Sequence, residues 1–321
     1  MNKSLDISVV GLSCVDCIAV ASERRWNVQN PVGDVRISAG GLGNALVAVS
    51  GLGLKVGVST RVGKDMFGDF LLNQWRELGV DTSEVTTDID RATGFAFVVN
   101  YNGERTPFYS AGSNAAFGQS DVSDKQCESS HCMLVFFAGA LPSLDGEPML
   151  ELVKRCHAAG TTVIMDVSDS IAADYGAIQS YLPYVNLVVN CEEGRRITGQ
   201  ESPREMLQTL SEMAGDGNTF LAVTRPDGVS LMSPSNGTRE YMDVVSPFYD
   251  LPVRDVVGAG DAFRAGLAAY ISIHNDDYQN GRLDYRELCL FASAVSYLYL
   301  SRSTDIRPFS ADDIRRLIAG V

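Results

Sequence analysis

Short apolar runs alternate with helical repeats along most of the chain, and the pattern is clearest after residue 132. Apolar runs of strand length and helical patterns follow one another at 133–138, 147–158, 162–166, 186–190, 203–214, 220–224, 261–273, 285–300 and 311–318. Strands that alternate with helices are typical of βαβ units, which build a parallel sheet covered by helices on both faces. We therefore predict a three-layer α/β/α body with a mainly parallel sheet.

The first third of the chain supplies further elements of the same body. A buried strand, a buried helix, an alternating strand and an amphipathic helix are predicted at 7–11, 44–52, 55–62 and 65–78. No internal repeat or low-complexity linker divides residues 1–321, so we predict a single domain.

A second, smaller β element is predicted within the same third. Residues 32–38 alternate between apolar and polar, as in a half-exposed strand, and a hairpin is expected around the turn Asn102-Gly103. We expect this element to be contributed by about 14–40 and 92–111 and to form a small β-sheet lid over a site on the body. In sheets of this kind, ligands bind beyond the carboxyl ends of the strands.

The net charge of the chain argues against some classes of binding partner. The 321 residues carry 40 acidic and 26 basic side chains, a formal net charge of -14. Such a surface repels nucleic acid and anionic membranes, so we expect neither as a partner. No apolar run reaches the 18 residues of a membrane helix, and residues 1–6 lack a signal-peptide pattern, which predicts a cytoplasmic protein. A small anion such as ATP can still bind through backbone N–H groups and a metal ion.

The seven cysteines are odd in number and scattered, which argues against a disulfide framework. Cys14 and Cys17 have C-x-x-C spacing, and Cys127, His131 and Cys132 complete a conceivable zinc set. Zinc prefers close pairs on tight turns, whereas the first pair lies in a strand-like segment. We therefore expect no zinc site.

The segment 255–263 carries the strongest chemical signal. Gly258, Ala259 and Gly260 are small and precede a long apolar helix, so their backbone N–H groups can face an anion at the helix N-terminus. Asp261 follows in the first turn, where it can accept the proton of an attacking hydroxyl. Its place at the positive end of the helix dipole predicts a lowered pKa. A glycine-rich turn with a favourable first-turn aspartate is the plain structural alternative.

The run from Asp255 through Ala268 resembles the C-terminal signature of the PfkB, or ribokinase-like, carbohydrate kinases at every defined position. Residues 39–44, Ala-Gly-Gly-Leu-Gly-Asn, resemble the N-terminal signature, although Leu42 and Leu46 depart from it. Other landmarks, which include Asp16, Asp166 and 190–193, line up across nearly the whole chain. The resemblance implies a ribokinase-like fold and an ATP-dependent phosphotransferase.

The resemblance also implies roles for individual residues. Asp261 is implied as the base and Gly258, Ala259 and Gly260 as the anion hole. Substrate contacts are implied for Asp16, Gly41 and Asn44. Asn190 and Glu193 are implied to serve Mg²⁺ and the nucleotide phosphates, Glu193 through water, and Thr224 and Gly228 are implied to lie beside the nucleotide. Asp255 and the carbonyl of Val257 are implied as a site for K⁺. Family lids often pair between subunits, which implies a homodimer.

The nucleotide half departs from the family pattern at several places. Residues 224–228, Thr-Arg-Pro-Asp-Gly, replace the usual Thr-x-Gly-x-x-Gly, Ser293 stands where Asn is frequent, and 304–306 lack a common Gly-Ala. Each implied site residue also has a plainer interpretation. Asp16 can cap a turn, Asn44 can be a helix N-cap, and Glu193 can complement a helix dipole.

We predict a Mg²⁺-dependent kinase that phosphorylates a hydroxyl of a small sugar or sugar-like molecule. The alternatives are a nucleoside kinase of the same fold and a non-catalytic sugar sensor. A dinucleotide-dependent oxidoreductase is weaker, because Leu46 stands in place of the third glycine of that fingerprint. The lid should select the substrate through residues such as Trp26, Asn27, Tyr101, Arg105 and Tyr109, which do not by themselves identify a sugar.

Overall fold

The computed structural model describes residues 3–21, 23, 25, 27–101, 104–138, 146–167, 175–215, 219–235, 237–253, 256–301 and 308–320. Predictions that fall on Trp26, the turn Asn102-Gly103, Asp255 and 304–306 lie outside this part of the chain. Within it, no helix is long and apolar enough to cross a membrane.

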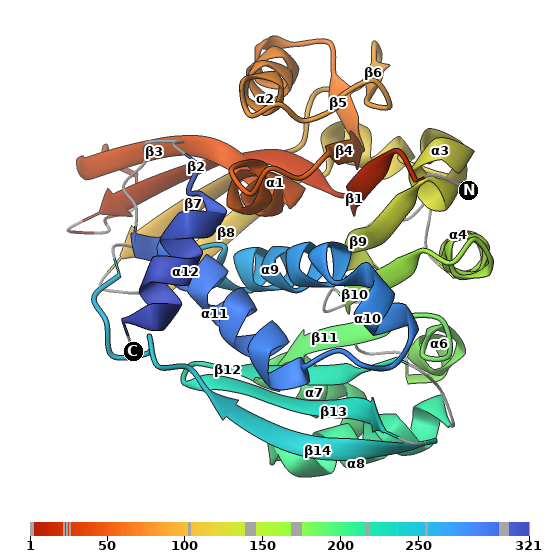
Figure 1. Cartoon of the computed structure of the whole chain (residues 1–321). Coiled ribbons are helices and arrows are strands. Elements are labelled where there is room, and N and C mark those ends of the chain that lie inside the picture. The colour runs from red at the N-terminus through yellow and green to blue at the C-terminus, as the bar shows by residue number, and fades with distance from the viewer. Residues whose placement is uncertain are drawn as a thin grey trace.

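An eight-stranded sheet forms the centre of the body (Figure 1), with the strand order β14-β13-β12-β11-β10-β9-β1-β4. Its strands are β1 (Leu5–Gly11), β4 (Val56–Ser59), β9 (Ser130–Ala138), β10 (Thr162–Val167), β11 (Asn186–Asn190), β12 (Leu221–Arg225), β13 (Gly228–Ser235) and β14 (Thr238–Val245). The strands from β4 to β12 pair in parallel, and β13 and β14 extend the sheet in antiparallel fashion. The predicted mainly parallel sheet is confirmed.

Helices cover both faces of this sheet (Figure 1). One face carries α1 (Leu42–Ser50), α9 (Ala259–Ile273), α10 (Asn275–Gln279), α11 (Tyr285–Ser301) and α12 (Ala311–Ala319). The other carries α3 (Asp124–Glu128), α4 (Glu147–Ala158), α6 (Tyr175–Tyr181), α7 (Cys191–Thr198) and α8 (Pro203–Ala214). A separate projection lies beside α1. It consists of the helix α2 (Met66–Glu77) and the short strands β5 (Arg61–Gly63) and β6 (Thr86–Asp88).

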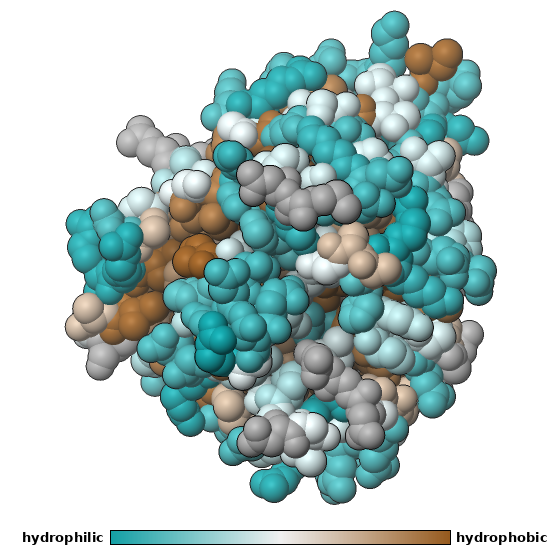
Figure 2. Space-filling view, turned by 45° about the vertical axis from the view of Figure 1, so that its right-hand side comes forward, coloured by the Kyte–Doolittle hydropathy of each residue, from teal (hydrophilic) through white to brown (hydrophobic). Residues whose placement is uncertain are grey.

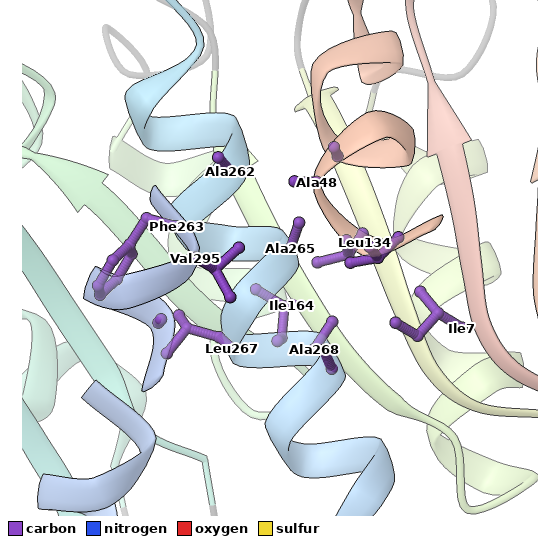
Figure 3. Close-up of a cluster of buried hydrophobic side chains, with 14 of the residues drawn as sticks. Ile7, Ala48, Leu134, Ile164, Ala262, Phe263, Ala265, Leu267, Ala268 and Val295 are labelled. Atoms are coloured by element: carbon purple, nitrogen blue, oxygen red, sulfur yellow. The ribbon is translucent and has the colours of Figure 1, made fainter. Parts of the chain in front are cut away.

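The core lies in two layers, one on each side of the sheet. Ile7 and Val9 of β1 belong to the layer under α9, whereas Val10 belongs to the opposite one. Strands that bury both faces read as continuous apolar runs, which explains why the sequence pattern identified them. Figure 3 shows how α9 presents Ala265 and Ala268 towards Ile7, Leu134 and Ile164 of the sheet.

A four-stranded sheet with the order β3-β2-β7-β8 lies beside the body and is called the lid below. It consists of β2 (Ser13–Ala21), β3 (Val32–Gly41), β7 (Phe95–Tyr101) and β8 (Glu104–Ser110). Asp16 pairs with Ser38 on one side and with Ala96 on the other. Two segments far apart in the sequence therefore build one sheet, as the pattern predicted.

Two features of the sheets differ from the sequence analysis. The predicted strand at 55–62 is wrong as a single element, because β4 joins the large sheet while β5 pairs with β6. The Thr60 side chain between them donates a 2.7 Å hydrogen bond to the carbonyl of Gly11, which fixes the bend. The antiparallel β13 and β14 were not predicted, since their polar, glycine-bounded pattern carries little hydrophobic signal.

Candidate active site

Polar groups gather at the carboxyl edge of the parallel sheet, as expected for an open α/β fold. Gly11, Asn190 and Thr224 lie at or near the ends of β1, β11 and β12, and Asp166 lies one residue before the end of β10. The N-terminus of α9 lies against the same edge, because Arg264 of α9 contacts Val188 in β11. The predicted site residues thus come from separate strands and helices.

The helix α9 begins where the sequence predicts an anion site. Gly258 is its N-cap, with φ 81°, and Ala259, Gly260 and Asp261 form the first turn. A side chain at Gly258 would be strained at this φ and would bring its Cβ within 3.0 Å of Asn44 and 2.9 Å of Tyr299. First-turn N–H groups have no partner within a helix, so this end of α9 can bind an anion.

Asp261 is held from two neighbouring helices. The Asn44 amide of α1 donates a 2.8 Å hydrogen bond to Asp261 Oδ2, and the Tyr299 hydroxyl of α11 donates one of 2.7 Å to Asn44 Oδ1. This chain of bonds fixes the orientation of both the amide and the carboxylate. The N-cap interpretation of Asn44 is wrong, because α1 begins at Leu42 with Gly41 as its N-cap.

Burial decides the pKa of Asp261. It raises that pKa above the ordinary value of 3.8, and the nearby Arg264 charge and the Asn44 hydrogen bond only oppose it. The lowered pKa expected from the helix dipole is therefore wrong. A raised pKa makes the carboxylate a better proton acceptor when it is ionised.

Asp16 faces the body from the middle of the lid. The Cys14 thiol donates a 3.2 Å hydrogen bond to Asp16 Oδ1. Burial raises the pKa of Cys14, and the negative charges of Asp16 and Asp261 raise it further, so both carboxylates lie near this thiol. A Cβ at Gly40 would lie 2.2–2.3 Å from the Asp16 carboxylate, so only glycine leaves room for it.

Gly41 lies directly after Gly40, at the junction of the lid strand β3 and the helix α1. Its φ of 59° favours glycine, and a Cβ there would lie 2.4 Å from the carbonyl oxygen of Leu12. Gly41 therefore turns the chain from the lid into α1. Because Gly41 ends the lid strand β3 and not a strand of the large sheet, the βαβ unit that the dinucleotide-binding interpretation requires is not formed here.

Asn190 and Glu193 form a capping box at the start of α7. Glu193 N–H donates to Asn190 Oδ1 at 2.9 Å, and Asn190 N–H donates to Glu193 Oε2 at 2.8 Å. The plain helix-end role of Glu193 is thus present. The same carboxylate oxygen of Glu193 also lies 3.8 Å from Nη2 of Arg264, so Glu193 also contacts a charged side chain of α9.

A cavity of about 470 Å³ opens beside the first turn of α9. It is lined by the predicted residues Thr224, Gly228, Ala259 and Gly260, together with Arg225, Pro226, Ser246, Phe248, Tyr249, Val253, Val256, Phe263, Ser293, Ser296, Tyr297 and Leu300. The hairpin between β12 and β13 forms one wall. Its Arg225 donates to Asp227 at 2.9 Å and to Asp243 at 2.6 Å, which supports the hairpin in place of the missing glycine.

Two polar residues of the site were missed by the sequence analysis. Tyr299 has no local signal, since only the packing of α11 against α1 brings it to Asn44. Arg264 does have a local signal, because it is a charged residue within an otherwise apolar stretch of helix. In the structure only 7% of it is exposed. Of the predicted K⁺ ligands, Val257 directly precedes Gly258, and Asp255 lies outside the described residues.

Comparison with known proteins identifies the family. The pfkB family carbohydrate kinase profile matches residues 4–312. The 5-dehydro-2-deoxygluconokinase of Geobacillus kaustophilus is 25% identical over 277 residues, 83% of this chain and 81% of that protein. The enzyme of that name from Listeria monocytogenes is 22% identical over 331 residues, 99% of this chain and 97% of its own.

Solved structures share the fold at low sequence identity. The ribokinase of Giardia lamblia aligns with a TM-score of 0.81 at 19% identity, over 98% of this chain and all of that chain. The fructokinase with bound ATP from Xylella fastidiosa aligns with a TM-score of 0.80 at 22% identity, over 98% of both chains. A putative ribokinase II of E. coli in complex with ATP and Mg²⁺ aligns with a TM-score of 0.77 at 20% identity, over 99% of this chain and all of that chain.

These likenesses confirm the predicted ribokinase-like fold. The family profile spans nearly the whole chain, from the start of β1 to the first residues of α12. The chain belongs to the pfkB family of carbohydrate kinases, and it is an enzyme that transfers a phosphoryl group to a hydroxyl of a sugar-like substrate.

Proposed function

We propose that the enzyme transfers the terminal phosphate of ATP to a sugar hydroxyl, with Asp261 as the general base. The observation that carries the proposal is the pair formed by Asp261 and Asn44 at the N-terminus of α9, opposite Asp16 of the lid. A carboxylate beside an anion site needs a reason to be there, and accepting the proton of the attacking hydroxyl supplies one.

The residues of the chain divide the work between binding and proton transfer. Asp16 accepts hydrogen bonds from two sugar hydroxyls, since a carboxylate offers two acceptor oxygens. The attacking hydroxyl gives its proton to Asp261, while Asn44 keeps that carboxylate oriented. The first-turn N–H groups of Gly260 and its neighbours stabilise the charge on the transferred phosphoryl group. Gly41 and Asn44 complete the sugar side of the site.

The nucleotide side is proposed to lie in the cavity that Thr224 and Gly228 line. Glu193 and Asn190 would hold Mg²⁺ there through water, because carboxylate and amide oxygens are ligands that suit this ion. When bound, Mg²⁺ neutralises phosphate charge during transfer. A monovalent cation held by Asp255 and the Val257 carbonyl is a further proposal, and the dependence of the rate on K⁺ at constant ionic strength tests it.

We propose a sugar acid as the first substrate to examine. The relatives named above are 5-dehydro-2-deoxygluconokinases, and Arg36 lies on the same face of the lid as Asp16, opposite Ile18. An arginine at that position can pair with a substrate carboxylate. A nucleoside remains the second candidate, because Tyr109 lies on this face too and can stack on a base.

The deciding experiment is ADP release with ATP and Mg²⁺. The panel contains 5-dehydro-2-deoxygluconate, other sugar acids, ketoses, aldoses and nucleosides, and Asp261→Asn is the control. Turnover of one compound that is lost in the variant supports the proposal. ATP hydrolysis or transfer that persists unchanged in Asp261→Asn contradicts it, and absence of ATP binding by calorimetry favours the sugar-sensor alternative.

We propose that the whole chain is one kinase domain that forms a homodimer through the lid. The face of the lid opposite Asp16 exposes Val35, Ile37, Phe97 and Phe108, whose exposed fractions are 51, 55, 38 and 60%. Figure 2 shows apolar side chains gathered on the left of the molecule, the side on which the lid lies in Figure 1. A second copy would bury this patch.

Light scattering on the purified protein tests the dimer. We expect the wild type to have twice the mass of the chain and Ile37→Asp with Phe108→Asp to be monomeric. A monomeric wild type at micromolar concentration contradicts the proposal.

We also propose a cytoplasmic location, in keeping with the free thiols of all seven cysteines, and fractionation of cells that express the protein tests it.

A further inference from the structure

Arg264 lies one helical turn after Asp261 on α9 and faces the sheet. Its neighbours on this helix, such as Ala265, Leu267 and Ala268, are fully buried and apolar. The arginine side chain itself is only 8% exposed. A buried charge is costly unless nearby groups compensate it, so its surroundings must explain its presence.

Those surroundings are a carbonyl and three carboxylates. Nε and Nη2 of Arg264 donate hydrogen bonds of 3.3 and 3.1 Å to the carbonyl of Val188. Nη1 lies 3.8 Å from Asp166 Oδ2 and 3.8 Å from Asp261 Oδ1, and Nη2 lies 3.8 Å from Glu193 Oε2. The guanidinium is therefore anchored to β11 and faces carboxylates that come from β10, α7 and α9.

The distances indicate how this centre works. At 3.8 Å, Arg264 interacts with each carboxylate mainly through charge, because the atoms are too far apart for a good hydrogen bond. The Cβ of a side chain at Gly260 would lie 3.0 Å from Nη1, so the cation also lies next to the proposed anion hole. One positive charge thus serves the proposed base and the carboxylate proposed to serve the metal.

A purely structural arginine does not require this arrangement. A side chain that only filled the space under α9 would be better apolar, since a buried ion pair is often no more stable than apolar residues of similar volume. Removal of Arg264 alone, in contrast, takes away a cation that lies 3.8 Å from each of the three carboxylates, whose mutual repulsion then increases. Such a cluster attracts a divalent ion directly.

We propose that Arg264 is a positioning residue, the shared counter-charge that holds the three carboxylates for phosphoryl transfer and weakens their binding of Mg²⁺ in the absence of nucleotide. The proposal deepens, and rests on, the function proposed above. It requires a metal response that can be measured without any substrate, and a rate effect that depends on both the charge and the shape of the side chain.

The first measurement is the melting temperature with and without Mg²⁺, in the absence of ATP and sugar and at constant ionic strength. For Arg264→Gln we expect a lower melting temperature in EDTA and a rise with Mg²⁺ that exceeds the wild-type rise by at least about 2 °C. Arg264→Lys keeps the charge and should respond as the wild type does. The control Arg61→Gln removes a partly buried arginine beside Asp88 and Asp121, outside the site, and should show no such excess.

The second measurement is the steady-state rate of the active enzyme. Arg264→Gln should lower kcat by about 10²-fold with little change in the KM for the sugar, because the reacting groups are misplaced and not lost. Arg264→Lys should recover part of that rate, since an ammonium retains the charge but cannot reproduce the fork of the guanidinium.

The outcomes separate this proposal from the proposed function. An Arg264→Gln protein with the wild-type Mg²⁺ response overturns the role of Arg264, even when Asp261→Asn is inactive. If Arg264→Gln does not fold, Arg264→Lys decides, and a wild-type kcat in that variant overturns the proposal. If the wild type phosphorylates nothing in the panel, the melting temperatures still decide whether Arg264 controls the cluster.

Discussion

The two halves of the site are built in different ways. On the side proposed to bind the sugar, Asp261, Asn44 and Tyr299 form a chain of short hydrogen bonds between three helices, and Asp16 approaches from the lid. On the side proposed to bind the nucleotide, the cavity of about 470 Å³ is lined largely by apolar and small residues such as Val256, Phe263 and Leu300. One half depends on the placement of individual atoms, and the other depends on shape.

This difference explains where the sequence keeps to the family pattern and where it departs. A base that must meet one hydroxyl tolerates few changes, because a small displacement is costly to the rate. The flat ring of a nucleotide, proposed to bind here, can be held by any surface of the right shape. The hairpin at 224–228 departs from the family pattern, and the ion pair of Arg225 with Asp243 supports it. Variants of the two halves should therefore affect different kinetic constants.

The largest effect is expected at the proposed base. Asp261→Asn retains the shape of the side chain but removes its capacity to accept a proton, so kcat should fall by at least about 10²-fold. The matched control is Asp69→Asn, which changes an exposed aspartate in the first turn of α2. ADP release at saturating ATP and sugar measures both. A near-normal rate in Asp261→Asn would rule out its role as base.

The next largest effect is expected at the lid. Asp16→Asn weakens hydrogen bonds to two sugar hydroxyls, each worth about 1.5–3 kcal/mol to a charged acceptor, and should lower kcat/KM for the sugar by roughly 10- to 100-fold. The KM for ATP should change little. Cys17→Ser, on the neighbouring position and the opposite face of β2, serves as control. A selective rise in the KM for ATP would contradict the assignment of Asp16 to the sugar.

The pH dependence of the rate sharpens the same comparison. Asp261 must be ionised to accept a proton, so activity is lost as the pH falls through its raised pKa. We expect the acid limb of kcat/KM above the ordinary value of 3.8, and Asn44→Ala should move it higher, because the Asn44 hydrogen bond opposes the shift. An acid limb that Asn44→Ala moves to lower pH would contradict this account.

The smallest effects come from two tyrosines on α11 that serve different halves. Tyr299→Phe removes the hydroxyl that orients Asn44, worth about 1 kcal/mol, and should lower kcat by about fivefold with the KM for ATP unchanged. Tyr297 lines the cavity proposed for the nucleotide and stacks on Phe248 with ring centroids 5.9 Å apart. Tyr297→Ala should raise the KM for ATP by about three- to tenfold with kcat retained. Equal effects of both changes on kcat would break the comparison.

Much of the body was predictable because its signals are local. The helices at Glu147–Ala158 and Pro203–Ala214 and the strand at Asn186–Asn190 have the predicted bounds. Their turns and apolar repeats lie within a few residues of each end. The strand expected at 55–62 failed because the choice of partner is not local: β4 and β5 belong to different sheets, although the alternation continues through both.

The sequence named most of the residues that the structure brings together at the candidate site, but it indicated less about their surroundings. The motif around Asp261 placed the carboxylate at a helix N-terminus, which is visible in the sequence and suggests a lowered pKa. The burial that reverses this effect comes from packing with distant parts of the chain, which no local pattern records. Tyr299 was missed for the same reason, since it reaches Asn44 from 255 positions away along the chain.

The chain leaves the body at Leu12 and returns at Leu42, whose N–H donates a 2.9 Å hydrogen bond to the carbonyl of Leu12. Residues 13–41 therefore form an excursion that starts and finishes at one point, and changes in its length need not disturb the body. The segment carries Asp16 and Arg36, which are proposed to contact the sugar, but not Asp261, the proposed base. We therefore expect that a segment of another sequence could be exchanged for it, like a cassette, so that the molecule recognised changes while the proposed base is kept.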